Sequence, residues 1–273
     1  MTSSSVYVVL FDVIPTLAST NPTMAARHFM ISFFFLFEML GNLVLVISAD
    51  NAVRSIEITA STRKLKGKRK CEICIQPMPR RSHHCRLCGA CILKRDHHCH
   101  FLVTCIGYKN QKYFVMFCLY LGFGAIYSAV LILLHLRVKY SVIFRDISSF
   151  LTVLPRAIYD YYIAHSIANE KLYLLILMYA ALLTGLLIIG LFVWQMILVS
   201  RGQTSFEFAY DRHNFRKRMM WNFLDVFGPY WFVTIILPFP LPQYSLGTYE
   251  ILTTKHRVKK LRNNDSSEKS KNK

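Results

Sequence analysis

Seven cysteines and five histidines lie between Cys71 and Cys105, a density that indicates metal binding. Two cysteines separated by two other residues, such as Cys71 and Cys74, can both reach one tetrahedral Zn²⁺ at Zn–S distances near ~2.3 Å. One such pair is a weak signal. Several pairs, interleaved with His-Cys dipeptides at these intervals, predict bound zinc.

One cysteine of this cluster is spare if two closed sites form. Two tetrahedral sites of three cysteines and one histidine each use six of the seven cysteines. Spacing alone does not say which cysteine is spare, nor how the ligands divide between two ions. Cys99 is a candidate, because the run Asp-His-His-Cys at 96–99 places a carboxylate and imidazoles beside a thiol, and such neighbours activate a thiol as a nucleophile. On spacing alone, a packing role for Cys99 is an equal alternative.

Long apolar segments flank the cluster. Hydrophobic residues make up 53% of the 273-residue chain, which excludes a purely soluble protein. Residues 172–200 lack Asp, Glu, Lys and Arg and exceed the ~20 residues that cross a bilayer as a helix. Residues 113–134 and 29–49 predict two further spans, and the weaker run at 5–19 predicts a fourth. We therefore predict a mainly α membrane protein, a four-transmembrane-helix bundle with a zinc-binding, cysteine-rich domain between its second and third helices.

The positive charges predict the orientation of the chain in the membrane. Of the 33 Lys and Arg residues, 14 lie within 52–112 and 13 within 201–273. Because cytosolic segments carry the Lys and Arg excess, we expect both segments in the cytosol, where disulfides are disfavoured and metal binding is favoured. The predicted divisions are two spans (1–50), the zinc domain (51–112), two spans with a lumenal connector (113–200) and a cytosolic tail, disordered at its end (201–273). The connector, 138–170, is expected to lie on the membrane surface, and no internal repeat is evident.

Residues 71–114 resemble the cysteine-rich domain of the DHHC family of protein S-acyltransferases (palmitoyltransferases). The resemblance rests on Pro-Arg-Arg-Ser-His-His-Cys at 79–85 and Asp-His-His-Cys at 96–99. It implies that Cys99 is the acyl-carrying nucleophile, His97 its general base and Asp96 the residue that orients His97. It also implies two structural zinc ions, one held by Cys71, Cys74, His84 and Cys91 and the other by Cys85, Cys88, His98 and Cys105.

The tail contains two shorter matches to that family. Thr-Ser-Phe-Glu at 204–207 is similar to its Thr-Thr-x-Glu motif, and Asn222 resembles the Asn of its C-terminal motif. We expect Glu207 and Asn222 to hold the tail against the zinc domain. The chain departs from the family where His100-Phe101 replaces Pro-Trp and Val103-Thr104 replaces Asn-Asn, which is typical of a divergent member.

The resemblance implies ping-pong catalysis, in which Cys99 takes an acyl group from a long-chain acyl-CoA such as palmitoyl-CoA and passes it to a target cysteine. The expected partners are acyl-CoA, proteins with membrane-proximal cysteines and the bilayer, without nucleic acid. Basic residues at 63–70, 80–81 and 94–95 could attract the CoA phosphates. A cavity between the membrane helices would hold the acyl chain, and the small residues that could widen it are Gly122, Gly124, Ala125 and Ser128.

Two further segments carry expectations of location. The run 231–242, with three prolines, is too short to cross the bilayer and is expected to insert as a re-entrant or interfacial segment. The final residues 269–273, Lys-Ser-Lys-Asn-Lys, resemble a dilysine retrieval signal, which predicts the endoplasmic reticulum or Golgi.

Two other classes of protein compete with the enzyme. A zinc-stapled membrane adaptor would use the cluster only to bind partners, and its Cys99 would carry no acyl group. A membrane-bound ubiquitin ligase with a cross-braced zinc domain is disfavoured, because such a domain has no need of a spare cysteine beside Asp96 and His97.

Overall fold

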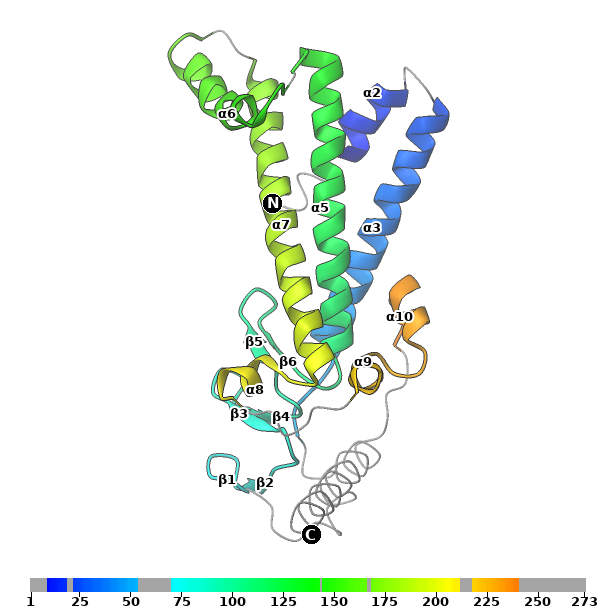
Figure 1. Ribbon diagram of the computed structural model, residues 1–273, viewed down its shortest axis with the longest axis vertical. Helices are drawn as coiled ribbons and strands as arrows, with labels where there is room; N and C mark the ends of the chain where they lie inside the picture. The colour runs from blue at the N-terminus through cyan, green and yellow to red at the C-terminus, as the bar shows by residue number, and fades with distance from the viewer. Residues whose placement is uncertain are drawn as a thin grey trace, which may run out of the picture. The chain divides into compact units, whose positions relative to one another are not determined.

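The structure is a computed structural model that describes residues 9–18, 22–53, 70–142, 144–165, 168–211 and 218–240. Within these ranges three helices are long and apolar enough to cross a membrane (Figure 1). They are α3 (Pro22–Ser48), α5 (Gln111–Tyr140) and α7 (Asn169–Arg201). Their 27, 30 and 33 residues exceed the ~20 that a bilayer requires. Three of the four predicted spans are therefore confirmed as helices long and apolar enough to cross a membrane.

The fourth predicted span, at 5–19, is not confirmed. Its described residues form a short π-helical segment, η1 (Val9–Val13), and the helix α2 (Ile14–Ala18), of five residues each. Together the two segments have about half the residues that a spanning helix needs. Val9, Val13 and Ile14 are buried in a hydrophobic core with residues of α5 and α7. The segment packs as part of a protein core, and the described fold is mainly helical with three candidate membrane helices.

The first of two compact units comprises residues 1–40 and 117–192. It contains α6 (Ile147–Tyr162), which begins at Asp146, where the Asp146 side chain accepts the Ser149 N–H at 2.7 Å. The Phe150 ring lies 4.8 Å from the ring of Tyr179 on α7, so α6 packs on the core of this unit. Part of the connector is thus a helix, while its place on the membrane surface stays a prediction.

Small residues allow close approach between α5 and α7 in this unit. A Cβ atom at Gly185 would lie 2.6 Å from Ile126 Cγ1, and one at Gly122 would lie 2.7 Å from Ile189 Cδ1. Glycine therefore lets these helices meet at a distance that a larger residue would prevent.

A cavity of about 70 Å³ lies between η1, α3 and α5 in the same unit. Gly124, Ala125 and Ser128, three of the four small residues expected at a cavity, line it together with apolar side chains such as Leu36 and Met39. The fourth, Gly122, faces α7 instead.

The second unit comprises residues 41–116 and 193–273 and contains three antiparallel hairpins. These pair β1 (Lys70–Cys71) with β2 (Gln76–Pro77), β3 (His83–Cys85) with β4 (Ala90–Ile92), and β5 (His97–Cys99) with β6 (Thr104–Ile106). Among the described residues after α7 lie the short helices α8 (Ser205–Ala209), α9 (Met219–Phe227) and α10 (Trp231–Ile236). Hairpins of two or three residues a strand bury little apolar surface, so a domain of this kind depends on other cross-links.

The hairpins contain a repeat that we did not predict from the sequence. His84 pairs with Cys91 in the second hairpin, and His98 pairs with Cys105 in the third, so the same register recurs after 14 residues (98 − 84 and 105 − 91). The expectation of no internal repeat was wrong. The repeat is shorter than those of solenoid folds, but the sequence contains it, with His-His-Cys at 83–85 and again at 97–99.

The segment after α9 packs against membrane-helix residues of the second unit. A Cβ atom at Gly41 on α3 would lie 2.4 Å from Pro238 Cγ, and the Tyr113 hydroxyl on α5 donates to the Phe239 carbonyl at 3.2 Å. Insertion of this segment into the bilayer stays a prediction, and residues 241–242 lie outside the described ranges.

Candidate functional site

Two groups of cysteine and histidine side chains in the second unit could each hold a metal ion. Within each group all ligand atoms lie within 4.8 Å of one another. The groups are Cys71, Cys74, His84 and Cys91, and Cys85, Cys88, His98 and Cys105. These are the two sets that the family resemblance implies. Strand pairing completes each group, because His84 stands opposite Cys91 and His98 opposite Cys105.

The separations within each group fit a tetrahedral zinc site. Zn–S bonds of ~2.3 Å and Zn–N bonds of ~2.0 Å give tetrahedron edges of about 3.5–3.8 Å. The Nδ1 atom of His98 lies 3.7 Å from Cys85 Sγ, 3.3 Å from Cys88 Sγ and 3.6 Å from Cys105 Sγ. In the first group, His84 Nδ1 lies 3.7 Å from Cys71 Sγ. The histidine nitrogens and the cysteine sulfurs of each group thus surround one position that a metal ion could occupy.

The electrostatics of the thiols also call for a cation. Burial and the neighbouring thiols raise the pKa of Cys91 to about 12, and the same two causes raise the pKa of Cys105. Three thiolates cannot be gathered in a buried site without positive charge, whereas a bound Zn²⁺ deprotonates its cysteine ligands. The donor set therefore fits the zinc ions expected from the sequence.

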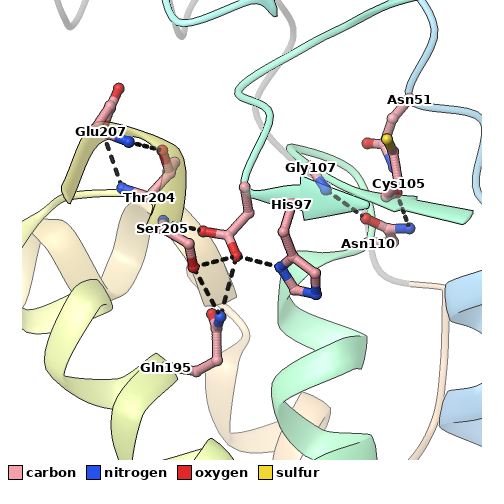
Figure 2. Close-up of polar contacts among 10 residues, drawn as sticks. Asn51, His97, Cys105, Gly107, Asn110, Gln195, Thr204, Ser205 and Glu207 are labelled. Carbon is pink, nitrogen blue, oxygen red and sulfur yellow. Dashed lines mark hydrogen bonds and ion pairs between the residues drawn. The ribbon is translucent and has the colours of Figure 1, made fainter. Parts of the chain in front are cut away.

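The carboxylate of Asp96 lies beside these clusters in a dense set of hydrogen bonds (Figure 2). Asp96 is 2% exposed. Ser205 donates its N–H at 2.7 Å and its hydroxyl at 2.9 Å, and Gln195 Nε2 donates at 3.0 Å. His97 Nδ1 lies 2.7 Å from Asp96 Oδ2. Burial raises the pKa of Asp96, but the bonds from His97, Ser205 and Gln195 outweigh burial and lower it, so this carboxyl is ionised at neutral pH.

His97 connects this carboxylate to Cys99. Its Nδ1 faces Asp96, and its ring lies edge-on to Phe114 with centroids 5.2 Å apart. Cys99 follows two residues later on β5, where its thiol contributes to the pKa of His97. Burial lowers the pKa of His97, but Asp96 and Cys99 outweigh burial and raise it to about 9. Burial likewise raises the pKa of Cys99, and the bond from His97 reverses this and lowers it. The pair therefore favours a thiolate beside an imidazolium, the reactive form of a nucleophilic cysteine.

The 14-residue repeat explains why Cys99 is the spare cysteine. Cys71, Cys85 and Cys99 hold equivalent places, and each accepts backbone N–H bonds from the turn that follows it. In the first two turns the third residue after the cysteine is a second cysteine, Cys74 or Cys88, whereas in the third turn it is Leu102. The β5–β6 turn thus keeps the backbone of a metal knuckle but lacks its second thiol.

Glu207 holds the tail against the zinc domain, as the sequence predicted. Arg81 donates Nε and a terminal N–H to the two Glu207 carboxylate oxygens, each at 2.6 Å, and both side chains are buried. Glu207 also caps α8, where its carboxylate accepts the Thr204 N–H at 3.0 Å. Arg81 has φ +64°, so its backbone occupies the left-handed region to make this contact.

Asn222 contacts the end of α7, and its expected contact with the zinc domain stays a prediction. Asn222 Nδ2 donates to the Ser200 carbonyl at 2.8 Å, and a Cβ atom at Gly202 would lie 2.6 Å from Asn222 Oδ1. Asn222 therefore ties α9 to the end of α7, because the backbone turn at Gly202 brings the last carbonyls of α7 to this side chain.

Four polar residues were missed by the sequence reasoning. Gln195 and Ser205 hold Asp96, and Asn51 and Asn110 hold the carbonyl of Cys105, at 3.3 and 3.1 Å (Figure 2). Gln195 carried a signal, since it is a polar residue in a 29-residue stretch that lacks charge. The others looked like ordinary residues of turns and helix ends.

Three of the basic residues expected to attract CoA make contacts or are buried within the second unit, and their role toward CoA stays a prediction. Arg81 is bound to Glu207, and Arg95 donates to the His84 carbonyl at 3.2 Å. Lys94 is 4% exposed, and burial, with Arg81, lowers its pKa to about 8. Residues 63–69 lie outside the described ranges.

These features define a class of protein. It has apolar helices able to cross a membrane, two clusters of three cysteines and one histidine, and an Asp-His-Cys site on the hairpin beside them. A family model described as DHHC palmitoyltransferase matches residues 64–212.

Proteins that are similar to this chain over most of its length are also named palmitoyltransferases. The chain is 32% identical over 244 residues to Palmitoyltransferase ZDHHC22 of Danio rerio, which covers 85% of this chain and 82% of that protein. It is 31% identical over 225 residues to the protein of that name from Homo sapiens, covering 78% and 77%. The chain belongs to the DHHC palmitoyltransferase family and is an acyltransferase.

Proposed function

We propose that the chain transfers a palmitoyl group from acyl-CoA to cysteine thiols of target proteins through an acyl-enzyme on Cys99. The observation that carries this proposal is the hydrogen bond between Asp96 and His97 on the strand that also bears Cys99, where the pKa of the thiol is lowered and that of the imidazole is raised. An adaptor would have no use for a buried, ionised carboxylate that orients an imidazole toward a thiol.

The proposed reaction has two steps. The Cys99 thiolate attacks the thioester carbonyl of acyl-CoA, the C–S bond to CoA breaks, and the CoA thiolate leaves, with the proton on His97 available to it. In the second step a target thiol gives its proton to His97 and attacks the acyl-enzyme carbonyl, and the Cys99 thiolate is released. Asp96 holds the tautomer and orientation of His97 throughout, as the carboxylate does in a catalytic triad.

The two metal groups would hold zinc as structural ions. Cys71, Cys74, His84 and Cys91 would hold one ion, and Cys85, Cys88, His98 and Cys105 the other. When bound, the ions supply folding free energy to hairpins whose strands are too short to be stable alone. Cys99 lies one residue after His98 and opposite Thr104 in the same hairpin, so the second ion would fix the backbone that carries the nucleophile.

The cavity between η1, α3 and α5 is the proposed site of the acyl chain. Its lining is mostly apolar, and each buried CH₂ group of a lipid chain contributes about 0.8 kcal/mol. Gly124 and Ala125 keep it open, because larger side chains at these positions would occupy it.

The remaining expectations concern location and organisation. We propose that the zinc domain and the tail, at 51–112 and 201–273, face the cytosol, because the Lys and Arg excess lies there. The targets would be proteins with cysteines close to the membrane. The retrieval signal at 269–273, which predicts the endoplasmic reticulum or Golgi, lies outside the described ranges.

A pulse and chase tests the proposed reaction. The purified protein, reconstituted in lipid nanodiscs, is loaded with a clickable palmitoyl-CoA, stripped of free acyl-CoA and then mixed with a membrane-tethered acceptor peptide that contains one cysteine. We expect the label to move from enzyme to peptide, and not to a matched serine peptide. Label that stays on the enzyme, or is lost to water at the same rate with either peptide, would contradict transfer to target thiols, and an enzyme that takes up no label would favour the adaptor.

A further inference from the structure

A cavity of about 280 Å³ lies in the second unit, beside the hairpin that carries Cys99. Residues 47–52, at and after the end of α3, form one wall, and residues of the second and third hairpins, among them Cys88 and Thr104, form the other. The metal groups use sulfurs of this second wall, but neither they nor the proposed chemistry use the space itself. The cavity is therefore a candidate for binding a further group.

Thr104 places this cavity next to the nucleophile. It stands directly opposite Cys99 in the β5–β6 hairpin. Directly opposed residues of an antiparallel pair point to one face, with Cβ atoms roughly 4.5–5.5 Å apart. In Figure 2, Asn51 of the first wall lies on the opposite side of His97 from Gln195. A side chain bound in the cavity would therefore stand beside the thiol, on the side away from α7.

The cavity has a negative electrostatic character. Asp50 is the only Asp, Glu, Lys or Arg among the described residues that line it, and its Oδ1 accepts the Ala52 N–H at 2.8 Å, which holds the carboxylate at the wall. Ser48 is the last residue of α3, so the negative end of that helix dipole lies at the same wall. Cys88 belongs to the second metal group, whose three thiolates would outweigh the two positive charges of Zn²⁺. The cavity therefore suits a cation.

We propose that this cavity binds a Lys or Arg side chain that flanks the target cysteine, and that Asp50 is a specificity-determining residue for the target protein. The methylene stem of either side chain would lie against Ile47 and Ile92, which also line the cavity, while its charged end meets the Asp50 carboxylate. The inference rests on the proposed function, because it describes the acceptor of the acyl group.

Proteins with cysteines close to the membrane supply such a cation. Cytosolic segments next to a membrane helix carry an excess of Lys and Arg. The chain itself has a net charge of +18, which by itself repels a basic segment. A local negative site beside Cys99 offsets this repulsion at the place where the two thiols must meet.

The test measures acyl transfer from the loaded enzyme in nanodiscs of phosphatidylcholine. Three membrane-tethered peptides contain one cysteine and differ only in the two residues beside it, which are Lys, Gln or Glu. For wild type we expect transfer to the Lys peptide to be roughly two- to fivefold faster than to the Gln peptide, the range of an ion pair at an exposed carboxylate, and transfer to the Glu peptide to be slowest. High salt should reduce this preference, because it screens the ion pair.

Two variants separate the site from the overall charge. Asp50→Asn keeps an oxygen that can accept the Ala52 N–H, and it should abolish the preference for the Lys peptide. Glu72→Gln removes the same charge from an exposed residue of the β1–β2 turn, and it should leave the preference as in wild type. Zinc is measured in each protein. No preference in wild type, or an equal preference in wild type and Asp50→Asn, would overturn the proposal.

A binding measurement keeps this inference separate from the proposed function. Fluorescent peptides with serine in place of cysteine are titrated with the unloaded enzyme, and their anisotropy gives the affinity. Tighter binding of the Lys peptide than of the Gln peptide, lost in Asp50→Asn, would support the cavity even if no acyl transfer occurs. Transfer to all three peptides at equal rates would instead defeat only this inference. A Lys preference that disappears when phosphatidylethanolamine is added would also overturn it, because a lipid ammonium group would then be the occupant.

Discussion

Replacing Asp96 by Asn should slow the acylation of Cys99 about ten- to hundredfold. The carboxamide keeps an oxygen that can accept the Ser205 N–H, but it loses the negative charge next to His97. It can also donate to His97 Nδ1 and so favour the wrong tautomer of the imidazole. Without the charge, the pKa of His97 falls from about 9 and the pKa of Cys99 rises.

The size of the effect follows from the pKa of His97. A shift from 6.5 to about 9 corresponds to about 3 kcal/mol in favour of the imidazolium. Asp96 and Cys99 supply this preference together, and the His97 side chain is 30% exposed, so solvent screening reduces the share of Asp96 to about 1.5–3 kcal/mol. Each 1.4 kcal/mol changes a rate about tenfold.

The assay has two readouts on protein whose zinc content has been measured. Single-turnover labelling by palmitoyl-CoA gives the acylation rate, and iodoacetamide labelling of Cys99 across pH gives the thiolate fraction. In wild type the thiolate should form below pH 9, because the pKa of Cys99 is lowered, and in Asp96→Asn the midpoint should move to higher pH. The difference in acylation rate between wild type and Asp96→Asn should become smaller above about pH 9, where His97 of the wild type loses its proton. Wild-type rates and an unmoved midpoint, with zinc retained, would refute the proposed role of Asp96.

Three further outcomes are expected. Glu207→Gln leaves the buried Arg81 without its charged partner, which should reduce the free energy of unfolding by about 3–5 kcal/mol and lower the melting temperature. A double variant with Met at both positions should recover part of this loss. An unchanged melting temperature in Glu207→Gln would contradict the ion pair. Cys85→Ser should reduce bound zinc from two ions to one and destabilise the zinc domain, which metal analysis and limited proteolysis would measure. Two tightly bound ions in this variant would show that the ligand set is wrong. Gly124→Leu should fill the membrane cavity and shift labelling from palmitoyl toward lauroyl chains, and an unaltered preference would place the acyl chain elsewhere.

The metal ligands and the catalytic residues could be predicted from the sequence, whereas most of the residues that hold them in place could not. The zinc knuckles and the Asp-His-His-Cys run are local patterns, and the structure brings together both ligand sets that the family resemblance implies. Spacing alone could not divide the ligands, because the sets interleave along the chain and only strand pairing places Cys91 and Cys105 opposite their histidines. Gln195 bonds Asp96 from 99 positions away, a contact that no local pattern encodes.

The fold shows the same division between local and long-range information. The three long apolar runs became helices of spanning length, because length and composition alone decide that outcome. The run at 5–19 was ambiguous, since its apolar residues suit either lipid or a protein core, and Val9 and Val13 pack in the core. Asn222 bonds the Ser200 carbonyl at the end of α7, a contact that depends on the turn at Gly202 and that no local pattern encodes.

The central claim is that Cys99 carries the acyl group while the other clustered cysteines hold zinc. The most direct measurement is hydroxylamine-sensitive labelling of the purified protein by a clickable palmitoyl-CoA, compared between wild type and Cys99→Ser with zinc measured in both. We predict labelled wild type, an unlabelled variant and two zinc ions in each. Equal labelling of the two proteins, or no labelling of wild type with zinc intact, would contradict the claim.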